Sequence, residues 1–186
     1  MIKLEGIFKA YPDKVLFENF SLTVNDGEKI CFTGVSGRGK TTLLRMMTGL
    51  EQPDRGTVLI SPGTKFSYLF QEDRLLPGFS LVKNMTAVGI PPERARAYLE
   101  KVMLSGEEST LPHKLSGGMA RRAALARALA AEYDTVYLDE PFTGQDEGTK
   151  KLLIELLKKE LEGKTALIIT HDDGDLSALA DRTVEL

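Results

Sequence analysis

The sequence has almost no cysteine, no tryptophan and no long apolar run. Cys31 is its one cysteine in 186 residues, which excludes an internal disulfide framework and a multi-cysteine zinc site and is typical of a reducing compartment. The apolar run at 165–170 is far shorter than the roughly 18 residues that a membrane-spanning helix needs. Residues 1–14 lack the apolar core of a secretion signal, so we expect a cytoplasmic chain.

The sequence also lacks a large excess of charge of either sign. Lys and Arg number 24 and Asp and Glu 27, so the net charge is −3 with both histidines neutral. A general nucleic-acid-binding surface would be basic, and we therefore expect no nucleic-acid partner. Hydrophobic residues make up 42% and charged residues 27%, an ordinary globular mixture that argues against disorder. The length suits one domain, which we place at 1–186.

Strand patterns alternate with helix patterns along the chain. The sequence predicts strands over 2–10, 15–24, 28–33, 57–60, 66–70, 135–139 and 165–170, and helices over 40–50, 117–131 and 147–163. Residues 72–115 are helical and irregular, and we expect them to form an inserted helical lobe. This alternation is typical of an α/β fold with a mainly parallel sheet and helices on both faces. Ligands bind at the carboxyl ends of the strands in such sheets.

A glycine-rich loop joins one predicted strand to a predicted helix. Residues 34–41, GVSGRGKT, match the GxxxxGK[ST] phosphate-binding pattern in the strand–loop–helix context that its mechanism requires. Lys40 can reach the β- and γ-phosphates, the Thr41 hydroxyl can bind Mg²⁺, and Arg38 is expected to be solvated. The backbone N–H groups turn toward an anion because of the glycines Gly34, Gly37 and Gly39. An ordinary glycine-rich turn is the alternative interpretation.

Two adjacent acids end the predicted buried strand at 135–139. Burying carboxylates is costly unless a metal or hydrogen bonds compensate. Successive side chains on a strand point to opposite faces, so Asp139 and Glu140 are expected to have different roles. Asp139 suits a Mg²⁺ site, and Glu140 suits activation of the attacking water. The alternative is a solvated strand end before the turn at Pro141.

The segment 115–119, LSGGM, resembles the LSGGQ-type signature of ATP-binding cassette (ABC) ATPases. The motifs follow in the order of that family: Tyr11, residues 34–41, Gln71, residues 115–119, Asp139-Glu140, Asp146 and His171. The resemblance covers essentially the whole chain. It implies a P-loop NTPase fold of the ABC type, with an N-terminal antiparallel β subdomain and a helical subdomain inserted at about 72–115.

The resemblance also implies a set of site residues for ATP and Mg²⁺. Catalysis is assigned to Glu140, His171, Gln71 and Lys40, and the metal to Thr41, Gln71 and Asp139. Nucleotide binding is assigned to Tyr11, Gly34, Val35, Ser36, Gly37, Arg38, Gly39, Lys40, Thr41, Thr42 and, on a partner's γ-phosphate, Ser116, Gly117 and Gly118. Alternatives remain: Tyr11 as a half-exposed strand residue, Gln71 as a surface residue, and Asp146 as a helix N-cap instead of an interface residue.

The resemblance implies partners as well. It predicts a head-to-tail dimer with a second ABC protomer, and a transmembrane permease held at the cytoplasmic face by the Gln71 loop and the helical lobe. A substrate-binding protein would act through that permease. Leu75, Leu76 and Pro77 are candidates for the docking groove or for the core. The segments around Gln71 and the signature look most like nitrate-, sulfonate- or taurine-type importers. The alternatives are a soluble ABC-type ATPase without a membrane partner and a nucleotide-gated regulatory module.

Two departures from the family pattern concern the interface. Thr143, Gly144 and Gln145 stand before Asp146 where the family usually has serine, a small residue and leucine. Met119 replaces the common glutamine of the signature. The loop before Asp146 is therefore the part of the site whose role the resemblance specifies least.

Overall fold

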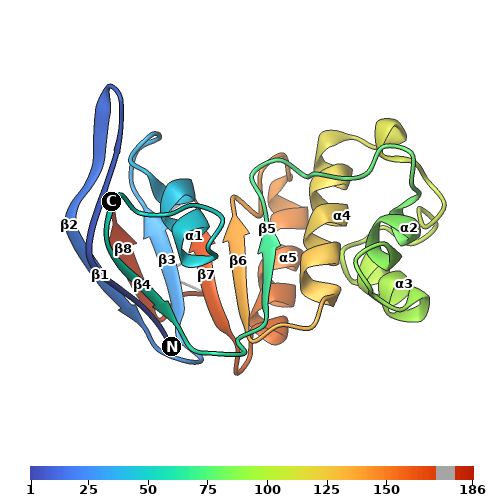
Figure 1. The fold of residues 1–186 in the computed structure, drawn as a ribbon. Coiled ribbons are helices and arrows are strands. Elements are labelled where there is room, and N and C mark those ends of the chain that lie inside the picture. The colour runs from blue at the N-terminus through green and yellow to red at the C-terminus, as the bar shows by residue number, and fades with distance from the viewer. Residues whose placement is uncertain (171–178) are drawn as a thin grey trace.

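A parallel β-sheet forms the centre of the molecule. The computed structural model describes residues 1–170 and 179–186. Five parallel strands lie in the order β5-β6-β7-β3-β8. Their bounds are β3 Lys29–Thr33, β5 Phe66–Leu69, β6 Thr135–Asp139, β7 Thr165–Ile169 and β8 Arg182–Glu185. The expected α/β fold with a mainly parallel sheet is confirmed, and Figure 1 shows the strands side by side.

Alternate residues of the central strands face two separate hydrophobic cores. On β6, Tyr137 faces one core while Val136 and Leu138 face the other. On β7, Leu167 and Ile168 divide in the same way. Because successive side chains point to opposite faces, a sheet covered on both sides reads as a continuous apolar run. The uninterrupted apolar sequence of β7 therefore reflects burial on both faces.

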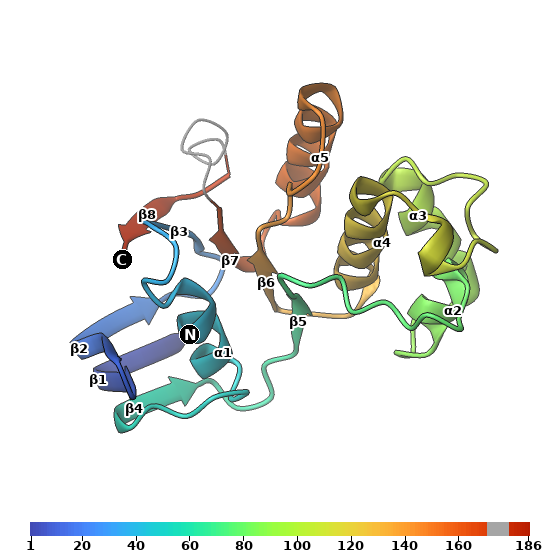
Figure 2. The ribbon, with the colours of Figure 1, turned by 90° about the horizontal axis from the view of Figure 1, so that it is seen from above.

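A second, antiparallel sheet covers one of these faces. It contains β1 (Ile2–Tyr11), β2 (Lys14–Val24) and β4 (Arg55–Ile60) in the order β2-β1-β4. Helix α1 (Lys40–Met47) lies between the two sheets, as Figure 2 shows. Its buried residues Leu43, Leu44, Met46 and Met47 complete the core between them. The two N-terminal strands are 10 and 11 residues long, and their bounds confirm the strands predicted over 2–10 and 15–24. Register shifts along β1 let the pair continue past irregular positions that interrupt the alternating sequence pattern.

The remaining helices cover the opposite face and one end of the molecule. They are α2 (Leu81–Thr86), α3 (Pro92–Lys101), the 3₁₀ helix η1 (Pro112–Lys114), α4 (Gly117–Ala130) and α5 (Glu147–Glu160). Figures 1 and 2 show α2 and α3 beside α4 at the end away from the antiparallel sheet. Their buried residues, among them Leu81, Met85 and Leu99, join the core beneath α4. No helix in the described part of the chain has the length and apolarity required to cross a bilayer.

Strand β8 is the one described strand that the sequence pattern did not indicate. It is four residues long, pairs with β3 alone and has no fully buried residue. A short edge strand of this kind has no alternation of apolar and polar residues by which it could be recognised. Its position is set by pairing with β3, a contact between segments about 150 residues apart.

Candidate nucleotide site

The phosphate loop leaves the end of β3 and enters α1. Gly39 is the N-cap of α1 and has a left-handed backbone with φ 97°, a conformation that glycine adopts without steric cost. A Cβ atom at this position would lie 3.0 Å from the ring of Phe17. No side chain caps the helix. The first N–H groups of α1 are therefore directed at the loop, where an anion can accept from them.

Two lysines hold the loop in this structure. Lys40 donates from Nζ to the carbonyl oxygens of Gly34 at 2.6 Å and Val35 at 3.1 Å. Lys14 donates from the β1–β2 hairpin to the carbonyl oxygen of Gly37 at 2.8 Å. Sequence reasoning missed Lys14, because no local pattern signals that the hairpin returns to the loop. Both ammonium groups add positive charge where phosphates would lie.

Asp139 ends β6 and reaches the first turn of α1. The Thr41 hydroxyl donates to Asp139 Oδ2 at 2.8 Å, and Asp139 is 1% exposed. Burial raises the pKa of Asp139, and the hydrogen bond from Thr41 and the nearby cations Arg121, Arg45 and Lys40 oppose that shift. A hydroxyl and a buried carboxylate in contact are the oxygen donors that Mg²⁺ prefers, so the residues fit this metal.

Glu140 follows directly and has different surroundings. Its backbone is left-handed, with φ 55°, which is uncommon for a residue with a side chain. Its N–H donates to the carbonyl oxygen of Ile169 at the end of β7, at 3.0 Å. Unlike the buried Asp139, Glu140 is partly exposed. The two acids therefore have different surroundings. The alternation expected along a strand is not the cause, because β6 ends at Asp139 and the chain turns at Glu140.

One cavity, of about 450 Å³, is lined by most of the residues that are expected to bind nucleotide or metal. Tyr11 lies at its edge, 46% exposed, and donates from its hydroxyl to Glu51 Oε1 at 2.5 Å. Gln71, at the exposed segment after β5, is also on its wall. The expected residues that line it are Tyr11, Ser36, Gly37, Gly39, Lys40, Thr41, Thr42, Gln71, Asp139 and Glu140. Gly34, Val35 and Arg38 belong to the same loop but do not line the cavity.

The signature residues lie elsewhere. Ser116 caps α4, and its Oγ accepts a hydrogen bond from the Met119 N–H at 3.2 Å. Ser116, Gly117 and Gly118 do not line the nucleotide cavity. A Cβ atom on Gly118 would lie 2.7 Å from the carbonyl oxygen of Gly144. The structure thus packs the signature turn against residues 142–145 and not against the phosphate loop of the same chain.

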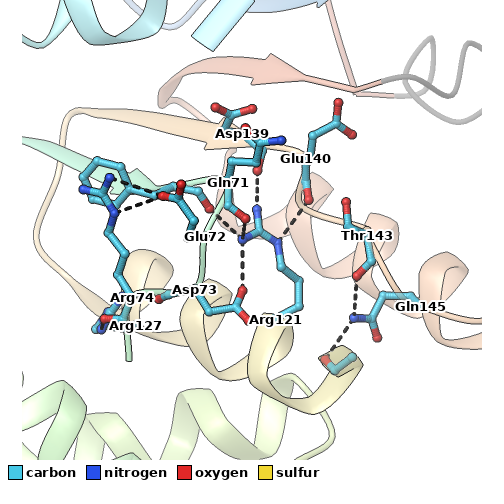
Figure 3. Close-up of polar contacts among 12 residues, drawn as sticks. Gln71, Glu72, Asp73, Arg74, Arg121, Arg127, Asp139, Glu140, Thr143 and Gln145 are labelled. Atoms are coloured by element: carbon cyan, nitrogen blue, oxygen red, sulfur yellow. Dashed lines mark hydrogen bonds and ion pairs between the residues drawn. The ribbon is translucent and has the colours of Figure 1, made fainter. Parts of the chain in front are cut away.

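Gln145 fastens these two segments to each other. Its Nε2 donates to the carbonyl oxygen of Gly118 at 2.9 Å, and its Oε1 accepts from Arg122 Nη1 at 2.9 Å. Figure 3 shows Gln145 beside the start of α4. The departure at Gln145 therefore has a structural consequence, a polar link where an apolar residue is usual. Asp146 caps α5 and accepts from the Thr149 N–H at 3.0 Å, which confirms the N-cap interpretation.

His171 lies outside the described residues, so the structure does not place it. Arg121 is a site neighbour that sequence reasoning missed. It is 3% exposed and extends from α4 to the backbone of both Asp139 and the segment after β5 (Figure 3). A signal was present, because a charged residue inside a mostly apolar helix needs partners. Nothing in the sequence identified those partners.

Comparison with known proteins gives a consistent result. The family described as ABC transporter matches residues 17–143. An aliphatic sulfonates import ATP-binding protein of Rhodococcus jostii is 42% identical, with 100% of this chain and 78% of that protein covered. One of the same name from Nocardia farcinica is 40% identical, with 100% and 77% covered. A dimeric ATP-binding cassette in a post-hydrolysis state with ADP and Pi superposes with a TM-score of 0.91 at 27% identity, covering 100% of this chain and 94% of that chain.

Proposed function

The chain belongs to the ABC transporter family, and we propose that two copies of it close head to tail around ATP to drive a membrane permease. It is the ATP-binding and ATP-hydrolysing subunit of such a transporter. The observation that carries the dimer is the separation of the signature from the nucleotide cavity. Ser116, Gly117 and Gly118 form a helix N-terminus suited to an anion, yet none of them lines the cavity of their own chain. The anion at this turn is the γ-phosphate of the ATP that a second chain binds.

Within one chain, the phosphate loop and the acid pair bind and cleave the nucleotide. Gly34–Thr42 surrounds the phosphates, Lys40 turns from the loop carbonyls to the β- and γ-phosphates, and Tyr11 stacks on the base. Thr41 and Asp139, with the amide of Gln71, would hold Mg²⁺, and the ion would supply positive charge beside the phosphates. Glu140 accepts a proton from the attacking water, and Gln71 and His171 orient that water and the γ-phosphate.

A second cavity, of about 890 Å³, supports docking of the permease. It lies between β5 and the helical lobe, and its apolar residues Leu50, Phe66, Leu76 and Val88 are exposed. Lys65, Arg74 and Arg94 lie on its wall with one acid, Glu132. These charged residues leave an excess of positive charge, although Lys65 is paired with Glu132 and Arg74 with Glu72. Of the candidates after Gln71, Leu76 lines this groove, whereas Leu75 packs against the core. An exposed apolar groove with a basic border suits an apolar helix with acidic flanks.

The names of the relatives support the remaining assignments. Both sequence relatives are called aliphatic sulfonates import ATP-binding proteins, so we assign this chain to an importer of small sulfonates or related oxyanions. Such an importer places the ATPase as a peripheral subunit on the cytoplasmic face of the membrane. A substrate-binding protein delivers the solute to the permease from the other side. The helical subdomain at about 72–115 carries the docking contact.

The dimer is tested by measuring the mass of the purified chain in solution. We expect a non-hydrolysable ATP analogue to shift the mass from monomer toward dimer, and the specific ATPase activity to rise with protein concentration. Ser116→Arg places a bulky side chain on the signature turn and should abolish the shift while leaving ATP bound to the monomer. A monomer with full activity, independent of concentration, would contradict the proposal.

The permease is tested by purifying the chain from solubilised native membranes and identifying the spanning chains that accompany it. Leu76→Glu should remove a spanning partner that the parent chain retains. The matched control is Leu59→Glu, because Leu59 is similarly exposed but lies on β4, away from the groove. Recovery of the same spanning partner with Leu76→Glu would show that this groove is not the docking site.

A further inference from the structure

Arg121 is a buried cation whose partners all belong to two functional segments. It is 3% exposed, on the second turn of α4, five residues after the signature N-cap Ser116. A buried guanidinium is strongly destabilising unless its charge and its N–H groups are matched. The partners of Arg121 therefore show which segments are attached to α4.

One side of the guanidinium holds the end of β6. Arg121 Nε donates to the carbonyl oxygen of Glu140 at 3.1 Å, and Nη2 donates to the carbonyl oxygen of Asp139. Glu140 has the left-handed backbone described above, which is unfavourable for a residue with a Cβ atom. A fixed donor on its carbonyl oxygen stabilises that conformation and with it the direction of the Glu140 side chain.

The other side holds the segment that carries Gln71. Arg121 Nη1 donates to the carbonyl oxygens of Phe70 at 2.6 Å and Gln71 at 3.2 Å, and to Asp73 Oδ1 at 3.1 Å. Figure 3 shows the guanidinium between this segment and the acid pair. The planar group presents its donors in a rigid fork, so it fixes the distance between the two segments as well as binding each.

We propose that Arg121 is a positioning residue for hydrolysis: it sets the side chains of Gln71 and Glu140 at a fixed separation through their backbone carbonyls. Arg121 does not line the nucleotide cavity, so it acts on the site only through these two segments. Arg121 lies on α4, the helix that begins at the signature turn. A nucleotide that a partner brings to this turn therefore contacts the same helix that aligns Gln71 and Glu140. The inference rests on the proposed roles of Gln71 and Glu140.

The chain offers a matched control on the same helix. Arg127 donates from Nη2 to the carbonyl oxygen of Asp73 and from Nη1 to that of Arg74, both at 2.8 Å. It therefore fastens the far end of the same segment to α4 without contacting Asp139 or Glu140. If Arg121 served only to attach this segment, loss of either guanidinium would have the same effect on turnover.

The experiment compares steady-state ATPase kinetics of Arg121→Lys and Arg127→Lys below their melting temperatures. Lysine keeps the charge, but one nitrogen cannot span two segments. Arg121→Lys should lower kcat about tenfold or more, because sub-ångström misplacement of reacting groups is costly, while KM for ATP changes less than about threefold. Arg127→Lys should lower kcat by less than about threefold. Arg121→Gln, which leaves no buried charge, serves if the lysine variant does not fold.

A double variant makes the test independent of stability. Combining Arg121→Lys with Gln71→Ala should lower kcat by less than the product of the single losses, because Arg121 acts partly through Gln71. Losses that multiply, equal losses for Arg121→Lys and Arg127→Lys, or an unchanged kcat for Arg121→Lys would each overturn the inference. Full activity of Gln71→Ala and Glu140→Gln would instead overturn the proposed function on which it rests.

Discussion

The molecule contains two glycine-bearing helix N-termini with opposite arrangements. At α1 the N-cap is Gly39, which has no side chain to accept a hydrogen bond, and the loop before it folds over a cavity. At α4 the N-cap is Ser116, whose hydroxyl accepts from the Met119 N–H, and the turn lies outside that cavity. The α1 terminus therefore lies on the wall of the nucleotide cavity, and the α4 terminus does not.

The difference concerns how each turn is supported. The phosphate loop is supported from within its own chain: Lys14 and Lys40 donate to its carbonyl oxygens, and Thr41 donates to Asp139 at the end of β6. The signature turn is supported from behind, by Gln145 and by the contact between Gly118 and Gly144. Its other side is where we propose that a partner's nucleotide binds. Four pairs of variants test this contrast, and they are given in order of decreasing expected effect.

The largest effect is expected for Glu140→Gln, in the nucleotide cavity. This variant should still bind ATP but should lose most of its ATP hydrolysis. We expect the ATPase rate to fall about 10²-fold or more, because a neutral amide cannot accept the proton from water. ATP affinity should stay close to that of the parent chain. Glu155→Gln, on the exposed face of α5, should keep the parent rate. If the ATPase rate of Glu140→Gln were unchanged, a residue other than Glu140 would have to accept the proton from water.

Thr41→Val should weaken the metal site while leaving the loop in place. The variant loses the hydroxyl that donates to Asp139, and we expect the Mg²⁺ concentration for half-maximal activity to rise about tenfold. Titration of activity with Mg²⁺ at fixed ATP measures the change. Thr41→Ser retains the hydroxyl and should restore the parent curve. If both variants behave alike, the hydroxyl has no part in metal binding.

Gly118→Ala and Gly117→Ala should differ in stability although they are adjacent. A Cβ at Gly118 would meet the backbone oxygen of Gly144, whereas nothing lies within 4 Å of one at Gly117. Thermal unfolding should show Gly118→Ala destabilised by about 1–3 kcal/mol, since this contact must be relieved by a backbone shift. Gly117→Ala should melt at or slightly above the parent temperature, because alanine favours a helix. Equal melting temperatures would contradict the close packing behind the signature.

The smallest effect is expected at the edge of the nucleotide cavity. Tyr11→Ala should lower the affinity for ATP about 2–10-fold, which matches the roughly 0.5–1.5 kcal/mol of an aromatic stack. Tyr11→Phe keeps the ring and loses only the exposed hydroxyl bond to Glu51, so its affinity should match the parent chain. Equilibrium binding measurements on both variants decide between stacking and a peripheral role for Tyr11.

Much of the fold and of the site was predictable because it depends on consecutive residues. The α/β pattern, the strand–loop–helix context of residues 34–41 and the acid pair at the end of β6 are local features. Arg121 and Lys14 were missed for the opposite reason, and Gln145 was noted as a departure from the family pattern without a predicted contact. Each acquires its role from a partner that only folding brings near, such as the carbonyl oxygen of Glu140 for Arg121 or that of Gly37 for Lys14.

The residues in their order along the chain were enough to identify the phosphate loop and the two acids, because glycines, a lysine and carboxylates at fixed spacings suit one chemistry. The resemblance to the family came from the LSGGM segment and the order of the motifs. Folding then determines which of these motifs meet. It placed Thr41 against Asp139 and fastened the Gln71 segment to the acid pair through Arg121. It also left the signature turn outside the cavity. The spacing of motifs along the chain does not specify how far apart they lie in space. The packing of α4 against the parallel sheet sets that distance.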